Sequence, residues 1–178
     1  MLQARPNCFW GKIAPILGAS CKGVSVGMAR TKNMLEAKAE DPSLARLRGR
    51  LGVPKVLSDL HLVTMVERRL PVEVIRALVE AGLQEREVHQ LIVPRRTLAH
   101  RIAGRQPLSQ EESDRAVRVA RISVMAEHAF GDAGRAWRWL RKPKHRFEGR
   151  SPIELLRTEA GARLVEEMIV QIDDGMAA

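Results

Sequence analysis

Hydrophobic residues recur at intervals of three and four along most of the chain after residue 42, which is the spacing of a helix with one buried face. No segment alternates between hydrophobic and polar residues for long enough to form a sheet. The pattern therefore predicts an all-α protein. The expected helices cover residues 43–50, 58–69, 71–81, 84–92, 95–102, 110–130, 133–142, 152–156 and 159–174.

Residues that cap helices support these boundaries. Ser58, Asp132 and Thr158 stand where a side-chain oxygen can accept hydrogen bonds from the free amides of a first turn. Ser109–Glu112 and Ser151–Glu154 have the Ser-x-x-Glu pattern of a capping box, in which each residue binds the other's free amide. Five of the predicted helices thus have a defined start.

The hydrophobic spacing also predicts which side chains face inward. In the long helix 110–130 the hydrophobic arc is wide, which indicates packing against more than one neighbour or a surface for dimer formation. Helical spacing in the other segments picks out Leu60, Val63, Val66 and Leu70 in 58–69, Leu98 and Ile102 in 95–102, Ala133, Ala136, Trp137 and Leu140 in 133–142, and Leu164, Val165, Met168, Ile169 and Ile172 in the last helix.

Residues 84–102 have the proportions of a helix-turn-helix, because two short helices flank a tight break at Val93 and Pro94. The first turn of a recognition helix contacts base edges, where Arg can bind guanine and Thr can contact the thymine methyl group. The alternative is a set of solvated charges on a small helical hairpin. Gln84 is a weaker helix cap than Ser or Thr. The predicted DNA-binding residues are Arg95, Arg96, Thr97, His100, Arg101 and Arg105.

Charge points to a polyanionic partner. The 178 residues contain 30 Lys and Arg against 21 Asp and Glu, a net charge of +9. Two stretches concentrate it: residues 94–105 contain no acid, and residues 135–150 contain seven basic residues and only Glu148 as an acid. Aromatic residues make up 3% of the chain, so its hydrophobic residues are mainly the small and aliphatic ones that build helix bundles.

The first 35 residues contain no acid and show no sustained hydrophobic period, and we expect them to be poorly ordered. A secretory signal is a rival interpretation, but Pro15 and Gly18 interrupt its hydrophobic stretch.

No run in the sequence approaches the roughly 18–20 apolar residues that span a bilayer. Two cysteines, Cys8 and Cys21, are too few for a disulfide scaffold, so the default expectation is the reducing cytoplasm.

Catalytic and metal-binding patterns are not found in the sequence. The five histidines lie far apart and no Cys/His spacing suits zinc. There is no phosphate-binding Gly-rich loop with its Lys and no nucleophile elbow. We therefore expect neither an enzyme nor a bound metal or cofactor.

From about Leu70 onward the chain resembles the Xre-type antitoxins that accompany RES-domain toxins, whose C-terminal part is the Xre/MbcA/ParS toxin-binding domain. The resemblance covers about 105 residues in order. It is carried by Arg96-Thr97-Leu98, Leu108-Ser109, Phe130-Gly131, Ala136-x-x-Trp139-Leu140, Pro143, Gly149-x-x-Pro152, Leu155-Leu156, Thr158-x-x-Gly161, Val165 and Gly175.

The resemblance implies an N-terminal helix-turn-helix domain followed by a small helical domain that covers the active site of a toxin encoded nearby. In that family the pair is a type II toxin–antitoxin system whose toxin acts on or through NAD, and the antitoxin also binds operator DNA and represses its operon. We divide the chain accordingly into an accessory or poorly ordered extension (1–55), a helix-turn-helix domain (56–108) and a toxin-binding domain (109–178), and expect a homodimer.

The predicted toxin-binding residues lie in the basic stretch and at the end of the last helix. Trp137 and Trp139 point about 200° apart on a helix, so both cannot face one core. The family motif places Trp139 in the core and leaves Trp137 for the toxin. The full set is Trp137, Arg138, Arg141, Lys142, Arg146, Arg150, Asp173, Asp174 and Gly175.

A second hypothesis is a free-standing helix-turn-helix transcriptional regulator whose C-terminal domain only forms dimers. A genomic neighbourhood without a RES-like reading frame would favour it.

Overall fold

The computed structural model describes residues 41–175, and within this range it contains helices and no strand. The helices are α1 (Pro42–Leu51), α2 (Asp59–Glu67), α3 (Glu73–Glu80), α4 (Glu85–Leu91), α5 (Arg95–Ala103), α6 (Gln110–Phe130), α7 (Ala133–Arg141), α8 (Pro152–Leu155) and α9 (Glu159–Asp173), with a 3-10 turn at His145–Phe147. The predicted all-α fold is confirmed. The predictions for residues 1–35, including Cys8 and Cys21, lie outside the described residues.

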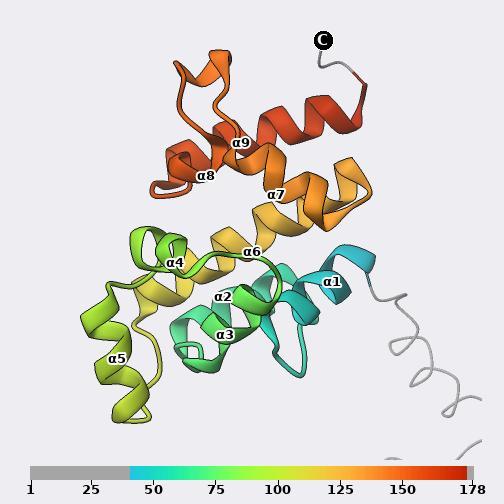
Figure 1. Ribbon diagram of the computed structural model, residues 1–178. Coiled ribbons are helices and arrows are strands. Elements are labelled where there is room, and N and C mark those ends of the chain that lie inside the picture. The colour runs from blue at the N-terminus through green and yellow to red at the C-terminus, as the bar shows by residue number, and fades with distance from the viewer. Residues whose placement is uncertain (1–40, 176–178) are drawn as a thin grey trace, which may run out of the picture. The chain divides into compact units, whose positions relative to one another are not determined.

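Helix α6 is the central element of the described part. It packs against α1, α2 and α3 along one portion and against α7 and α9 along another, and in Figure 1 it runs between α7–α9 above and α1–α5 below. Ile122, Ala120 and Ala126 are completely buried. The wide hydrophobic arc of this helix is therefore covered within the chain, so the helix offers no broad dimer surface.

Caps begin the helices where the sequence predicts them. Ser58 accepts a hydrogen bond from the amide of His61, Asp132 from Arg135, and Thr158 from Gly161. Both predicted capping boxes form, because the Glu112 and Glu154 carboxylates accept from the amides of Ser109 and Ser151. These local interactions satisfy amides that a helix leaves free at its start.

A buried hydroxyl ties the N-terminal helices to α6. Ser113 accepts from the amide of Leu70 at 2.9 Å and donates to the carbonyl of Ser109 at 2.8 Å. The amide of Leu108 donates to the carbonyl of Leu70 at 2.9 Å. The loop before α6 and the loop after α2 are thereby fixed to each other, which sets where α5 leaves the body.

Several predicted inward faces are wrong in detail. Leu60 and Val63 of α2 are exposed, and Leu62 is the buried residue of that helix. Leu164 of α9 is half exposed, while Val165 and Ile169 are buried. Helix α2 has a single buried residue, so helical spacing alone does not decide which position it is.

Helix α1 packs against α3 and α6, and its Leu47 and Leu51 belong to the core. Gly52 ends the helix in the left-handed conformation, at φ 62°. Arg50 donates to the carbonyl of Ala81 at 2.9 Å and forms an ion pair with Glu127. The part of the predicted extension 1–55 that the structure describes is thus integrated with the helices that follow.

Candidate functional site

Helices α4 and α5 follow each other across the tight turn that the sequence predicts. Val88, Leu91, Ile92 and Val93 are all buried, and Pro94 precedes the first turn of α5. The Arg115 guanidinium of α6 donates to the carbonyl of Ile92 at 3.4 Å, so the turn is tied to the central helix. Helix α5 itself contains no fully buried residue and projects from the body (Figure 1).

The N-terminal turn of α5 presents basic side chains to solvent. Arg95, Arg96 and His100 are exposed, Thr97 is half-buried, and Arg105 is exposed in a left-handed conformation at φ 49°. No intramolecular partner for Arg95, Arg96 or Arg105 is found among residues 41–175. These guanidinium groups are available to an external anion.

Arg101, a predicted DNA-binding residue, is bound within the chain. Its guanidinium forms an ion pair with Glu112 of α6 at 2.8 Å and donates to the carbonyl of Pro107 at 2.9 Å. The two side chains of the pair are 20% and 9% exposed. Its donors therefore hold α5 against the start of α6, and its assignment as a DNA-binding residue stays a prediction.

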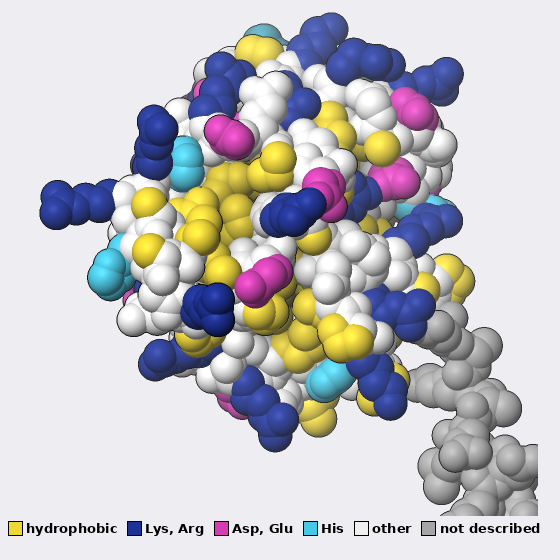
Figure 2. All heavy atoms as spheres, turned by 60° about the horizontal axis from the view of Figure 1, so that its bottom comes forward, with side chains coloured by type: hydrophobic (Ala, Val, Ile, Leu, Met, Phe, Trp, Pro, Cys, Tyr) yellow, Lys and Arg dark blue, Asp and Glu magenta, His cyan; other side chains and the backbone are white. Residues whose placement is uncertain are grey.

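Ile102 is also misplaced by the sequence prediction, because its side chain is 57% exposed and only Leu98 of the expected pair packs on the core. Figure 2 shows the lower side of the view in Figure 1, with Lys and Arg side chains around its rim and hydrophobic side chains exposed between them. Between residue 41 and the start of α6, the large exposed hydrophobic residues are Leu57, Leu60, Val63 and Ile102.

The two tryptophans of α7 exchange the roles that the family motif suggested. Trp137 is 6% exposed, and its indole N–H donates to the carbonyl of Ala81 at 2.8 Å. Trp139 is half-buried on the outer side of the helix. The burial of Trp137 agrees with the hydrophobic spacing that places it beside Leu140, and it leaves this residue little surface for a toxin.

Arg141 is likewise bound within the chain. It forms an ion pair with Glu87 of α4 at 2.7 Å and donates to the carbonyl of Gly82 at 2.7 Å, and its guanidinium lies 5.0 Å from the centre of the Trp137 ring. These donors are directed into the molecule, and the assignment of Arg141 as a toxin-binding residue stays a prediction.

An aromatic and basic cluster occupies the outer side of α7 instead. Trp139 lies 5.3 Å from Phe130 between ring centres, and the Lys144 ammonium lies 4.8 Å from the Trp139 ring. Burial, and then the charge of Lys142, lower the pKa of Lys144. Phe130 and Lys144 are not among the residues predicted from the sequence. The pattern that points to them is an aromatic residue at the end of one helix, followed by a segment of aromatic and basic residues.

Other predicted toxin-binding residues surround this cluster or lie at the end of α9. Arg138 and Lys142 are exposed, Arg146 donates to Gln171, and Arg150 lies 3.7 Å from Glu148. Asp173, Asp174 and Gly175 are exposed, with Gly175 at φ 70°.

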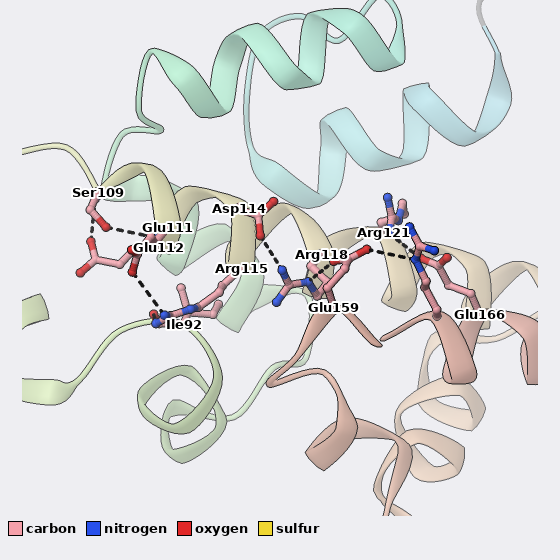
Figure 3. A network of polar contacts seen from close by, with 11 residues as sticks. Ile92, Ser109, Glu111, Glu112, Asp114, Arg115, Arg118, Arg121, Glu159 and Glu166 are labelled. Carbon is pink, nitrogen blue, oxygen red and sulfur yellow. Dashed lines mark hydrogen bonds and ion pairs between the residues drawn. The ribbon is translucent and has the colours of Figure 1, made fainter. Parts of the chain in front are cut away.

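Ion pairs also join α6 to α9 (Figure 3). Arg118 contacts Asp114 of its own helix at 2.5 Å and Glu159 of α9 at 2.9 Å, and its side chain is only 11% exposed. Arg121 contacts Glu166 at 2.5 Å. Within the described part of the chain, no group of three or more metal-binding side chains gathers, and no helix there is long and apolar enough to cross a membrane.

Comparison with known proteins agrees with this geometry. Residues 61–121 match the Antitoxin Xre-like helix-turn-helix domain family, and residues 125–175 match the Antitoxin Xre/MbcA/ParS C-terminal toxin-binding domain family. The first match includes α4 and α5, and the second includes α7, α8 and α9.

Curated relatives have the same character. An Antitoxin Xre of Pseudomonas putida is 43% identical over 131 residues, which are 74% of this chain and 82% of the relative. An Antitoxin Xre of Yersinia enterocolitica is 35% identical over 47% of this chain and 57% of its own length. A Prs ADP-ribosylating antitoxin of Sphingobium sp. is 32% identical over 46% of this chain and 57% of its own length. The chain therefore belongs to the Xre antitoxin family, with a helix-turn-helix DNA-binding domain and a C-terminal toxin-binding domain.

Proposed function

We propose that this antitoxin binds operator DNA through α5, represses its own operon, and neutralises a RES-domain toxin encoded nearby by covering the active site of that toxin. The observation that carries the DNA-binding half is the exposed basic turn of α5. Arg95 and Arg96 are exposed and have no partner among the described residues, so both guanidinium groups are free to bind DNA.

Base contacts and phosphate contacts are separable in a binding assay. We expect Arg95→Ala or Arg96→Ala to weaken binding to the DNA upstream of the reading frame by about 1–3 kcal/mol if the side chain contacts a base. A phosphate contact would instead lower the slope of log affinity against log salt by about one. Arg163→Ala, an exposed arginine of α9, is the matched control. Unchanged affinity in the Arg95/Arg96 double variant would place the DNA-binding helix elsewhere.

We propose that the toxin contacts the outer side of α7 and the loop after it, around Trp139 and Lys144. Aromatic and arginine side chains provide most of the binding energy in many protein interfaces, and here a half-buried aromatic pair is surrounded by exposed basic groups. Arg138, Lys142, Arg146, Arg150, Asp173, Asp174 and Gly175 remain candidates at this surface.

Co-expression with the product of the adjacent reading frame tests this proposal. The full chain is expected to restore growth, and Trp139→Ala is expected to weaken the complex by about 2 kcal/mol or more. Arg76→Ala on α3, whose side chain is 84% exposed, is the control that leaves the complex intact. A chain that neither binds nor suppresses that product would contradict neutralisation.

The RES assignment rests on the residues that resemble RES-associated antitoxins and on the relative named Prs ADP-ribosylating antitoxin, whose name implies a toxin that uses NAD. An NAD-consumption assay of the adjacent product tests it. If that product leaves NAD unchanged and transfers no ADP-ribose, the toxin belongs to another class.

We also propose that the protein works as a homodimer in the cytoplasm, because a dimeric helix-turn-helix protein binds two operator half-sites about one helical turn apart. Its working division is the one predicted, 56–108 for DNA and 109–178 for the toxin, with α6 shared between them.

The rival function is a regulator whose C-terminal domain only forms dimers. The observation that favours it is the exposure of Leu164 and Val170, which are 50% and 47% exposed on α9. Trp139→Ala distinguishes the two functions. Loss of toxin binding with an intact dimer supports the antitoxin, whereas loss of the dimer supports the rival regulator.

A further inference from the structure

A buried carboxylate of the helix-turn-helix receives its main partner from the toxin-binding domain. Glu87 lies in the first turn of α4, and its side chain is 6% exposed. It accepts from the amide of Gln84 at 2.8 Å and from two nitrogens of Arg141 at 2.7 and 2.9 Å. The paired geometry of a guanidinium on a carboxylate gives direction as well as attraction.

The same end of α7 holds the turn between α3 and α4. Trp137 donates to the carbonyl of Ala81, and Arg141 donates to the carbonyl of Gly82. Gly82 has φ +110°, and a Cβ built there would lie 2.4 Å from the Trp137 indole nitrogen. The turn therefore lies directly against the indole ring, and α4 begins from a point that α7 defines.

Open space lies along the rest of this boundary. A groove of about 350 Å³ separates part of α4 from α8 and includes Glu87 in its wall. A second groove, of about 960 Å³, lies between the start of α6 and the α8–α9 connection, and Arg157 lines both. This side of α4 is therefore open to solvent, and the contacts that Arg141 and Trp137 make with Glu87 and with the turn before α4 come from α7.

We propose that Arg141 and Trp137, although they lie in the toxin-binding domain, are positioning residues for DNA binding: they hold Glu87 and the α3–α4 turn, and thereby set the orientation in which α5 is presented. The inference rests on the proposed DNA binding by α5. It also makes α7 a shared element, since its inner side fixes the helix-turn-helix while its outer side carries Trp139 and Arg138.

The test uses the full chain and double-stranded DNA from upstream of its reading frame. Arg141→Gln is expected to weaken binding about tenfold, within the usual range of coupling between sites. The matched control is Arg118→Gln, which removes a still more buried arginine that pairs with Glu159 of α9 and not with α4; it should change the affinity less than twofold. Wild-type affinity in Arg141→Gln, or an equal loss in Arg118→Gln, would overturn the proposal.

A double-mutant cycle distinguishes positioning from general loss of stability. If the pair acts as a unit, Glu87→Gln with Arg141→Gln binds DNA no more weakly than the worse single variant, because no unpaired buried charge remains. If the losses of DNA affinity in the two single variants multiply in the double variant, the two residues act independently. That result would overturn the proposal.

Hydrogen exchange of backbone amides supplies a readout that does not depend on DNA. Arg141→Gln should lower protection in α3–α5 and leave α9 as in wild type. If the wild-type protein does not bind the DNA fragment, the proposed function is wrong. Hydrogen exchange then tests by itself whether Arg141 holds α3–α5 in place. Unchanged protection, or an equal loss in all helices, would refute it.

Discussion

Replacing Arg101 by Gln tests whether a basic residue of α5 holds the helix in place or binds DNA. In the folded protein its guanidinium pairs with Glu112 at 2.8 Å and donates to the carbonyl of Pro107 at 2.9 Å. After the substitution, the Glu112 carboxylate keeps the amide of Ser109 as a donor at 2.7 Å. In the variant, the largely buried Glu112 carboxylate therefore keeps only part of its hydrogen bonds.

The expected loss of stability lies between two limits. Breaking a fully buried ion pair costs about 3–5 kcal/mol, while an exposed pair contributes about 0–1 kcal/mol. Because the Arg101 side chain is 20% exposed and that of Glu112 is 9% exposed, we expect the free energy of unfolding to fall by about 1–3 kcal/mol. Urea denaturation followed by circular dichroism measures this directly.

Operator binding over a range of salt concentrations completes the test, with Arg96→Gln as the comparison. A positioning role predicts that Arg101→Gln keeps the wild-type salt slope, whereas Arg96→Gln loses about one unit of slope if Arg96 contacts a phosphate. Arg96 is exposed and should leave stability unchanged. An Arg101→Gln protein as stable as wild type, with a reduced salt slope, would show that Arg101 binds phosphate and that the reasoning is wrong.

Three further predictions address the turns, the acid side of the pH profile and self-association. Gly82→Ala should destabilise the fold by several kcal/mol, because the new Cβ meets Trp137, whereas Gly131→Ala, at φ +68° with open space around it, should cost about 1–2 kcal/mol in thermal unfolding. Hydrogen bonds from the backbone and side chain of Ser151 lower the pKa of Glu154, so its contribution to stability is present above pH 4.5 and is lost as the pH falls through the lowered value; Glu154→Gln should show a shallower acid loss than wild type. Leu60→Glu should shift a homodimer toward monomer in light-scattering measurements if the exposed α2 side is the dimer contact, and an unchanged mass would exclude that surface.

Much of the fold follows from local patterns, because helix starts depend on neighbouring residues. The capping boxes at Ser109 and Ser151 form as their spacing predicts. The side of α7 also follows from spacing, which places Trp137 inward with Leu140. The family motif pointed to Trp139 instead, and a motif that records which residues recur does not record which of them is buried.

Contacts between residues distant in the chain could not be predicted. The pairs Arg101–Glu112 and Arg141–Glu87 depend on how α5 and α7 are placed, and a count of charges along the sequence treats these arginines like their exposed neighbours. The basic stretches therefore overstate the number of residues available to DNA or to a toxin. Exposure in the folded protein separates Arg95 and Arg96 from Arg101.

A pattern shared by these two pairs makes such arginines easier to find. Glu87 and Glu112 both occupy the third position of a helix, accept from the capping residue's amide, and are buried. A buried carboxylate needs more than one donor, and a guanidinium supplies several in one plane. Where the glutamate of a capping box is buried, as at Glu87 and Glu112, an arginine elsewhere in the chain supplies the additional donors. Glu154, which is exposed, accepts from the amide of Ser151, and no ion pair between it and an arginine is found among residues 41–175. The burial of the capping box, and not its sequence, therefore decides whether its glutamate pairs with an arginine inside the protein.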